Sequence, residues 1–123
     1  MDYSQLSDFE INKRVAEVIY KDRDGLFVAR NIPSREGVTI VAEINSEDIC
    51  IAAADYCNNW SDAGPVIESK LICLAADVFA ESHDGGKWVA QPAYGWEKER
   101  VRSNNPLRAA MIVFLMMQDA NHA

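Results

Sequence analysis

The chain has 123 residues, the length of one ordinary domain, and its 49% apolar and 25% charged residues are normal for a globular protein. The formal net charge of -7 argues against nucleic-acid binding by the surface as a whole, because such affinity comes mostly from cations that neutralise phosphates. Three cysteines, Cys50, Cys57 and Cys73, form no Cys-x-x-Cys pair and stand beside apolar or aromatic neighbours, which predicts small buried thiols.

The sequence also carries a prediction about cellular location. Asp2 to Glu10 is polar and acidic where a signal peptide would need a basic and then an apolar stretch. The longest strongly apolar stretch, residues 109–117, is too short to cross a bilayer. We therefore expect a single cytosolic domain over residues 1–123, without contact to a membrane.

The first predicted element is a helix that begins after Ser7. Ser7 and Glu10 have the spacing of a capping box, in which each side chain satisfies a free backbone N–H of the first turn. The apolar residues that follow recur at helical spacing and predict one buried stripe: Ile11, Val15, Val18 and Ile19. Asp24-Gly25 is expected to end this region with a turn.

Strands follow at residues 26–30 and 38–44. The second alternates strictly, which places Val38, Ile40, Ala42 and Ile44 on one predicted face. The loop composition of residues 31–37 separates the two strands. Residues 49–53 fit either a further short strand or the start of a helix, because their alanines suit both.

The amino-acid composition changes in the middle of the chain. Residues 55–65 are rich in Asn, Asp, Gly and Pro, which predicts an ordered loop. A short helix is expected over residues 65–70, with Pro65 near its first position. Residues 71–80 and 87–91 then predict a hairpin joined through residues 83–86, where paired glycines supply positive φ angles.

The last predicted helix is the clearest. Asn104 or Asn105 can cap it, Pro106 falls in its first turn, and it runs over residues 107–118. Its apolar residues cover nearly every face, which is typical of an interior helix or a subunit contact and leaves the oligomeric state open. The predicted class is α+β: a small, mostly antiparallel sheet packed against an N-terminal helix and a buried C-terminal helix.

The loop of residues 55–62 is the first candidate binding site. Its amides and carboxylate lie near two aromatic rings, and amides can both donate and accept hydrogen bonds in recognition. The candidate binding residues are Tyr56, Asn58, Asn59, Trp60 and Asp62. In the alternative interpretation these polar side chains bond their own backbone and cap the following helix, while Trp60 packs over the core.

The second candidate site is the basic-aromatic segment, residues 87–108. It carries a local net charge of +3 and interleaves aromatic rings with cations, as binding of single-stranded nucleic acid requires. Its candidate residues are Lys87, Trp88, Tyr94, Trp96, Lys98, Arg100, Arg102 and Arg108. The alternative is a solvated loop that its tryptophans anchor to the core.

Arg108 carries a further prediction of its own. A cation in the first turn of a helix opposes the positive end of the helix dipole. We expect Arg108 to be retained there for an internal ion pair with a carboxylate such as Asp55 or Asp62, or for an anionic partner.

Catalytic patterns are sparse. Cys57 and His83 could form a nucleophile and base, but nothing in their spacing brings them together, and a buried thiol is the stronger expectation. Scattered carboxylates such as Asp55, Asp62, Glu68 and Asp77 arise by chance in so acidic a chain. The sequence shows no clustered metal ligands, glycine-rich phosphate loop or nucleophile elbow, so we expect no catalytic residue, metal or cofactor.

Three stretches together resemble a known family. They are residues 2–12, residues 56–67 with the Cys-Asn-Asn motif, and residues 105–115, which begin Asn-Pro-Leu-Arg-Ala-Ala. In this order they resemble the NinX-like proteins of lambdoid phages and of prophages in enteric bacteria, over the whole chain. Trp60 departs from the pattern, since proline or another residue is more usual there. The resemblance implies a bacterial cytoplasmic setting and an accessory role during infection, and it supplies no catalytic residues.

These observations predict a non-enzymatic phage or prophage accessory protein that acts by binding a host or phage protein. The expected surface combines the loop of residues 55–62 with Trp88, Trp96 and Arg102. The alternative is a small nucleic-acid-binding protein that uses the basic-aromatic segment.

Overall fold

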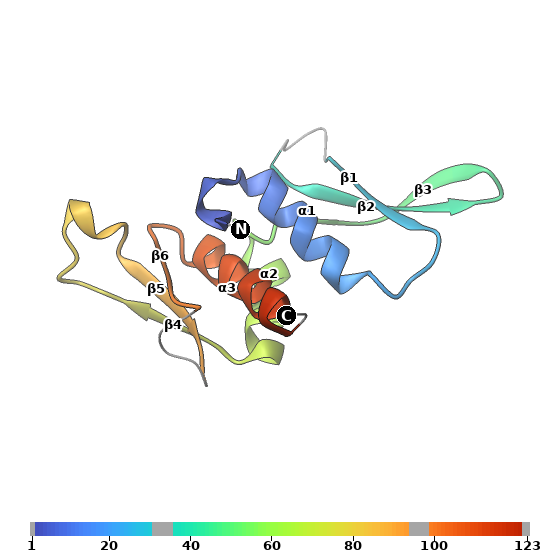
Figure 1. Ribbon diagram of the computed structural model, residues 1–123. Helices are drawn as coiled ribbons and strands as arrows, with labels where there is room; N and C mark the ends of the chain where they lie inside the picture. Colours follow the sequence, from blue (N-terminus) through green and yellow to red (C-terminus); the bar gives the residue numbers. More distant parts are fainter. Residues whose placement is uncertain (1, 31–35, 94–98, 122–123) are drawn as a thin grey trace.

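Three helices lie between two antiparallel sheets in the computed structural model, which describes residues 2–30, 36–93 and 99–121 (Figure 1). The helices are α1 (Asp8–Ile19), α2 (Trp60–Lys70) and α3 (Pro106–Asn121). The first sheet has the order β1-β2-β3, with β1 (Leu26–Arg30), β2 (Val38–Ile44) and β3 (Glu47–Ala54). The second has the order β4-β5-β6, with β4 (Ile72–Ala76), β5 (Trp88–Pro92) and β6 (Val101–Ser103).

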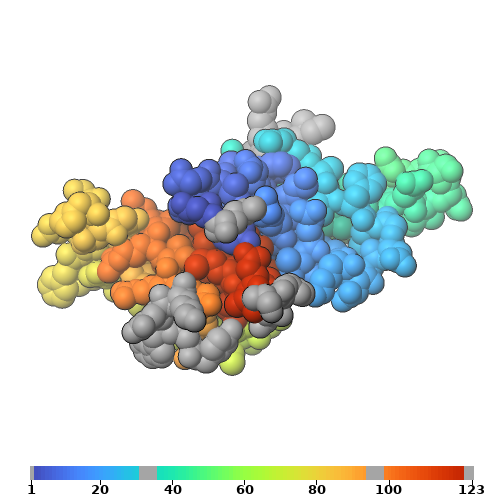
Figure 2. All heavy atoms as spheres, in the orientation of Figure 1, coloured from blue at the N-terminus to red at the C-terminus, as the bar shows by residue number. Residues whose placement is uncertain are grey.

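The elements stack in the order first sheet, α1, α3, second sheet. Helix α1 contacts β1 and β2, while α3 contacts α1, α2 and all three strands of the second sheet. The hairpin tips of the two sheets therefore point to opposite ends of an elongated molecule (Figure 2). The class α+β is confirmed, but the strands form two small sheets where the sequence indicated one.

Helix α1 begins where its cap predicts. The Ser7 side chain accepts a hydrogen bond from the backbone N–H of Glu10 at 3.2 Å, and the Ser7 hydroxyl donates to the Glu10 carboxylate. Ile11 and Val15 are fully buried, as the apolar stripe predicts. Ile19 is 42% exposed, so its assignment to the buried stripe is wrong: it lies at the end of the helix, on the rim of a cleft described below.

The first sheet confirms the two predicted strands and shows that residues 49–53 belong to a third. Asn45 and Ser46 both have positive φ angles, as a tight two-residue hairpin requires. The register shifts between Ile40 and Val41, and this bulge ends the strict alternation. Ile44 was expected on the buried face and is exposed, because it lies at the hairpin tip, away from the core cluster.

Helix α2 begins five residues earlier than expected. Its first residue is Trp60, and Asn59 caps it by accepting from the Ser61 N–H at 2.9 Å. Pro65 therefore lies inside the helix, and its expected place near the first position is wrong. The asparagine cap outweighs the proline as a start signal because it satisfies a free N–H of the first turn.

The second sheet contains the predicted hairpin, with β4 ending at Ala76 and not at Ala80. Asp77 turns the chain there, since its carboxylate accepts from the Phe79 N–H at 3.0 Å. Strand β6 was not anticipated, because three residues give no periodic signal. It passes so close to Gly86 that a Cβ at this position would lie 2.2 Å from the backbone of Ser103.

Helix α3 is buried within the chain itself. Asn105 caps it, accepting from the N–H groups of Leu107 and Arg108 at 3.0 and 3.2 Å. Every residue from Ala109 to Leu115 is buried. Contacts with α1 on one side and the second sheet on the other explain why so many faces of this helix are apolar.

Candidate binding cleft beside the Asp55–Asp62 loop

A hydrogen-bonded cluster joins the starts of α1 and α3 to the loop before α2. We call it the polar junction; it consists of Asp8, Asn12, Asp55, Asn58, Asn105 and Arg108. Asn12 is fully buried on α1, and its amide donates to the carbonyl of Glu36 and to a carboxylate oxygen of Asp55, both at 2.8 Å. Its oxygen accepts from the Cys57 N–H at 2.9 Å. Asn12 thereby ties helix α1 to two segments distant in sequence.

Asn105 extends the polar junction to α3. Its amide donates to the carbonyl of Cys57 at 2.7 Å and to the Asn58 side chain at 3.2 Å. Asn58 in turn donates to the carboxylates of Asp8 and Asp55. One face of the loop is therefore fixed by hydrogen bonds within the chain.

Arg108 does form the predicted internal ion pair, but with a different carboxylate. Its guanidinium lies 2.7 Å from Asp8 and also donates to the carbonyls of Ser4 and Leu6. The expected pairing with Asp55 or Asp62 is wrong. Asp8 opens α1 beside the start of α3, so its charge offsets a cation that opposes the α3 dipole.

The other loop residues also make structural contacts. Asn59 caps α2, and the Asp62 carboxylate accepts from the Asp55 N–H at 2.9 Å. Tyr56 is buried. Trp60, however, is 57% exposed, so the expectation that it packs over the core is wrong. The structural interpretation thus accounts for the polar side chains, and Trp60 is left as an exposed ring beside them.

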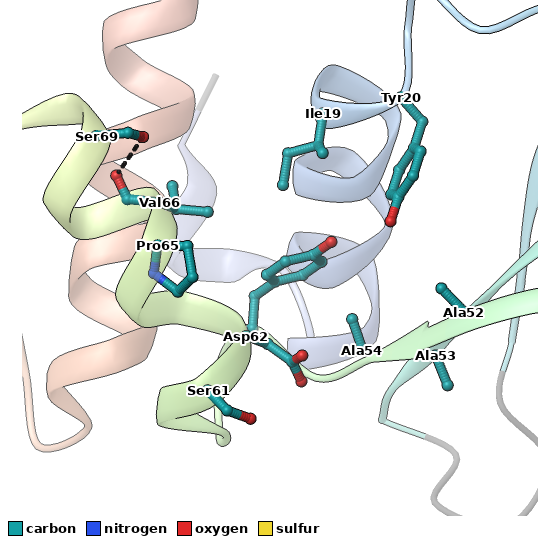
Figure 3. A pocket seen from close by; sticks show the side chains of 11 residues that line it. Ile19, Tyr20, Ala52, Ala53, Ala54, Ser61, Asp62, Pro65, Val66 and Ser69 are labelled. Atoms are coloured by element: carbon teal, nitrogen blue, oxygen red, sulfur yellow. Dashed lines mark hydrogen bonds between the residues drawn. The ribbon is translucent and has the colours of Figure 1, made fainter.

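A cleft of about 410 Å³ opens next to this loop, between α2, the end of α1 and strand β3 (Figure 3). Three consecutive alanines of β3, residues 52–54, line one side, and Ser61, Asp62 and Ser69 line the other. Ile19, the last residue of α1, and Tyr20, its C-cap, complete the rim. The walls therefore combine small apolar groups with hydroxyls and one carboxylate.

The polar groups of the cleft influence one another. Burial, with smaller effects of the neighbouring Tyr20 and Asp62, raises the pKa of Tyr56 well above its ordinary range. Its hydroxyl is protonated at neutral pH, as in any tyrosine, and burial keeps it protonated into the alkaline range, so it can donate as well as accept a hydrogen bond. No lysine or arginine lines this cleft in the described part of the chain, so its single carboxylate makes it acidic.

The structure divides the basic-aromatic segment. Arg102 lies in β6 and pairs with Asp77 at 3.0 Å while donating to the carbonyl of Gly86, so much of its charge is already compensated. Trp88 is half-buried in β5, and Arg100 is exposed. Tyr94, Trp96 and Lys98 lie outside the described residues. Arg100 and Arg102 line a pocket together with Ser4, whose carbonyl accepts a hydrogen bond from Arg108 of the polar junction.

The chain matches the family model described as "Bacteriophage P22, NinX" over residues 2–118. The chain belongs to the NinX family. No curated protein and no solved structure matches it. The three stretches that carry the resemblance contribute five of the six side chains of the polar junction: Asp8, Asn12, Asn58, Asn105 and Arg108. In this NinX protein those stretches therefore meet in space and hold three elements together.

Of the three cysteines of this NinX protein, one is buried as expected and two are exposed. Cys57 is fully buried, and burial raises the pKa of its thiol well above the ordinary range. Cys50 and Cys73 are exposed, so their assignment as buried thiols is wrong: both belong to edge strands at the outer sides of the sheets. His83 is also exposed, next to Glu81 and Asp84, and the buried Cys57 thiol has the wrong ionisation for a nucleophile.

Sequence reasoning missed two features of the NinX fold. Asn12 resembles any polar residue of an amphipathic helix, and only its apolar helical neighbours Val15 and Ala16, three and four positions on, hinted at burial. The cleft itself has no sequence signal. Among the described residues, no cluster of acids, histidines and cysteines has a metal-binding arrangement, and no helix could span a membrane.

Proposed function

We propose that this NinX-family protein, a phage accessory protein, acts by binding a host or phage protein through the cleft and the adjacent Trp60. Family membership supports the phage setting. The observation that carries the binding proposal is the exposure of Trp60, 57% of whose surface faces solvent next to two cleft residues, Ser61 and Asp62. Tryptophan is among the residues most enriched in interface hot spots, where it fills a partner's pocket.

The position of Trp60 suits an anchor residue. It is the first residue of α2, directly after the Asn59 cap, and the polar junction fixes the preceding turn. A side chain on a rigid element loses little further backbone entropy when it binds. Exposure of the apolar ring to water is unfavourable in free energy, and burial of the ring against a binding partner would remove this penalty.

Capture from phage-infected bacterial cells tests this proposal. The tagged protein should retain a protein partner in the presence of nuclease, and Trp60→Ala should lower the recovery by at least about tenfold. Phe79→Ala provides the matched control, since Phe79 is an aromatic ring with 88% exposure in the turn after β4. Both variants should keep the wild-type free energy of unfolding within about 0.5 kcal/mol, because both rings are exposed. Equal recovery with Trp60→Ala would contradict the proposal.

The nucleic-acid alternative makes a different prediction for the same experiment. It depends on Lys98, Arg100, Arg102 and Trp96, and it requires recovery that nuclease abolishes and that an Arg100→Ala/Arg102→Ala double variant loses. The Arg102–Asp77 ion pair and the net charge of -7 favour the protein partner.

A further inference from the structure

Strand β3 lies at the edge of its sheet, and its outer side meets the cleft. In the order β1-β2-β3, described strands pair with β3 on the β2 side alone. Every second residue of an edge strand directs its N–H and C=O away from the sheet, where another chain can bond to them. Ala52, Ala53 and Ala54 all line the cleft, although successive side chains point to opposite faces, so the cleft borders the strand along its edge (Figure 3).

The edge is protected in one half and open in the other. Charged residues, prolines and bulges are the usual devices that prevent an edge strand from pairing with other chains. In β3 the acids Glu47 and Asp48 and the bulge opposite Ile40 and Val41 all precede Ala52. The stretch from Ala52 to Ala54 has no such device, and its small side chains allow another backbone to approach. This open stretch coincides with the cleft.

The wall of the cleft across from β3 indicates which side chain of a bound peptide would fit there. Asp62 uses one carboxylate oxygen to accept from the Asp55 N–H, and no described cation lies within ion-pair distance of it. The hydroxyl-bearing residues Ser61 and Tyr20 lie on the same cleft. A carboxylate among hydroxyls, in a protein of net charge -7, favours a lysine or arginine side chain.

We infer that the cleft binds an extended peptide segment of the partner protein, which adds as a strand to the free edge of β3 at Ala52–Ala54 and directs a basic side chain to Asp62. This inference rests on the proposed function and specifies how the partner is held. Strand addition of this kind draws affinity from main-chain hydrogen bonds and specificity from pockets for alternate side chains. Here the cleft beside α2 is the pocket, and Trp60 directly precedes the cleft residue Ser61 in the chain.

A displayed library of random dodecapeptides, selected on the purified full chain, tests the inference. The enriched peptides should alternate β-branched with polar residues and should carry lysine or arginine. In amide NMR spectra, the best peptide should shift the signals of Ala52–Ala54. Replacing its basic residue by glutamine should weaken binding at least about tenfold. Enrichment of helical or acidic peptides, or no enrichment, would overturn the inference.

Backbone methylation of the selected peptide examines the hydrogen bonds directly. In a strand only alternate residues bond to a given neighbour, so N-methylation at one set of alternate residues should abolish binding while the other set has little effect. Equal effects of the two sets would show that the peptide does not add to the sheet.

Two alanine variants supply the matched pair in the protein. Ala53→Arg places a cation on the free edge of β3 and should lower peptide affinity at least about tenfold. Ala75→Arg makes the same change at an exposed alanine of β4, the edge strand of the other sheet, and should leave affinity unchanged. Unfolding in urea confirms that both variants fold. Equal affinity of the Ala53→Arg variant would overturn the inference.

Two further results separate this inference from the proposed function. If Ala53→Arg still captures the cellular partner while Trp60→Ala does not, the partner binds without strand addition: the inference fails and the proposed function stands. If light scattering shows a dimer that Ala53→Arg converts to a monomer, a second copy of the chain occupies the edge, and the inference is overturned.

Discussion

At the scale of single residues, the fold depends on a buried asparagine. Asn12 is a fully buried polar side chain within the core of apolar residues. Three of its four hydrogen-bonding positions are used: both N–H groups donate, to Glu36 and Asp55, and the oxygen accepts from Cys57. Among the described residues, no buried side-chain nitrogen or oxygen lacks a partner. Buried polar groups of this kind stabilise a structure only while every member is satisfied.

Replacing Asn12 by alanine should therefore destabilise the protein more than replacing an exposed asparagine. Asn12→Ala leaves the buried N–H of Cys57 without its acceptor, which we expect to cost about 2–3 kcal/mol. Asn59→Ala, at the exposed cap of α2, is the matched control and should cost about 1 kcal/mol. Urea denaturation measures both free energies of unfolding. Equal losses would show that the buried contacts contribute nothing special.

Because Tyr3 titrates, the free energy of unfolding should vary with pH in the alkaline range. Burial, together with the hydrogen bond that its hydroxyl donates to Asp119, raises the pKa of Tyr3 from 10.0 to about 12. The folded state thus favours the protonated form, and this stabilisation is complete below pH 10 and is lost as the pH rises to about 12. Tyr3→Phe removes the titrating group.

The difference in unfolding free energy between wild type and Tyr3→Phe should therefore shrink above pH 10. Urea denaturation of both proteins at a series of pH values measures this difference, and the comparison cancels the titration of groups that they share. A difference that stays constant through this range would contradict the assignment of the raised pKa.

At the scale of elements, caps and backbone geometry decide where each helix and strand begins and ends. Asn59 and Asn105 start α2 and α3, and the asparagine cap places Pro65 inside a helix. Gly86 permits β6 to pass close to the turn before β5. Gly64, in contrast, lies in α2 with open space where a Cβ would be. Adding a side chain should therefore destabilise the protein at position 86 and should meet no obstacle at position 64.

Substituting both glycines by alanine tests this contrast. Gly86→Ala combines a φ of 142° with a collision against the backbone of Ser103, and it should cost about 3 kcal/mol or more. Gly64→Ala should stabilise by about 0.5–1 kcal/mol, because alanine loses less conformational entropy in a helix. Thermal and urea unfolding report both changes. A neutral Gly86→Ala would show that the close approach does not exist in solution.

At the scale of the whole molecule, α3 connects the two halves. The two sheets lie on opposite sides of the helices, and α3 contacts α1, α2 and the second sheet. Phe114 is among the largest fully buried side chains of this helix. One continuous core cluster extends from α1 through α3 to β4 and β5. The halves share this core, which predicts that residues 1–123 unfold as one domain.

A single unfolding transition is the expected result. Amide signals from β2 and β5 should disappear at the same urea concentration as the helical signal. Phe114→Ala should cost about 3–5 kcal/mol and should shift all three midpoints together. Separate midpoints for the two sheets would show two units in place of the predicted single domain.

The sequence by itself determined the elements whose signals are local. The Ser7 cap, the Asn105-Pro106 start of α3, the alternation of residues 38–44 and the paired glycines before β5 depend on near neighbours in the chain, and each element formed where its pattern indicated. The apolar composition of α3 also predicted its burial, because a helix with few polar faces must be covered on several sides.

The tertiary structure alone decided which distant groups meet. Arg108 pairs with Asp8, a hundred positions away, because two helices begin side by side, and no local pattern encodes that contact. The burial of Asn12 and the exposure of Ile19, Cys50 and Trp60 likewise depend on which element packs against each residue. The cleft likewise depends on how α2, the end of α1 and β3 are placed relative to one another. Local sequence fixes backbone conformation over a few residues, while a site requires contacts that only long-range packing creates.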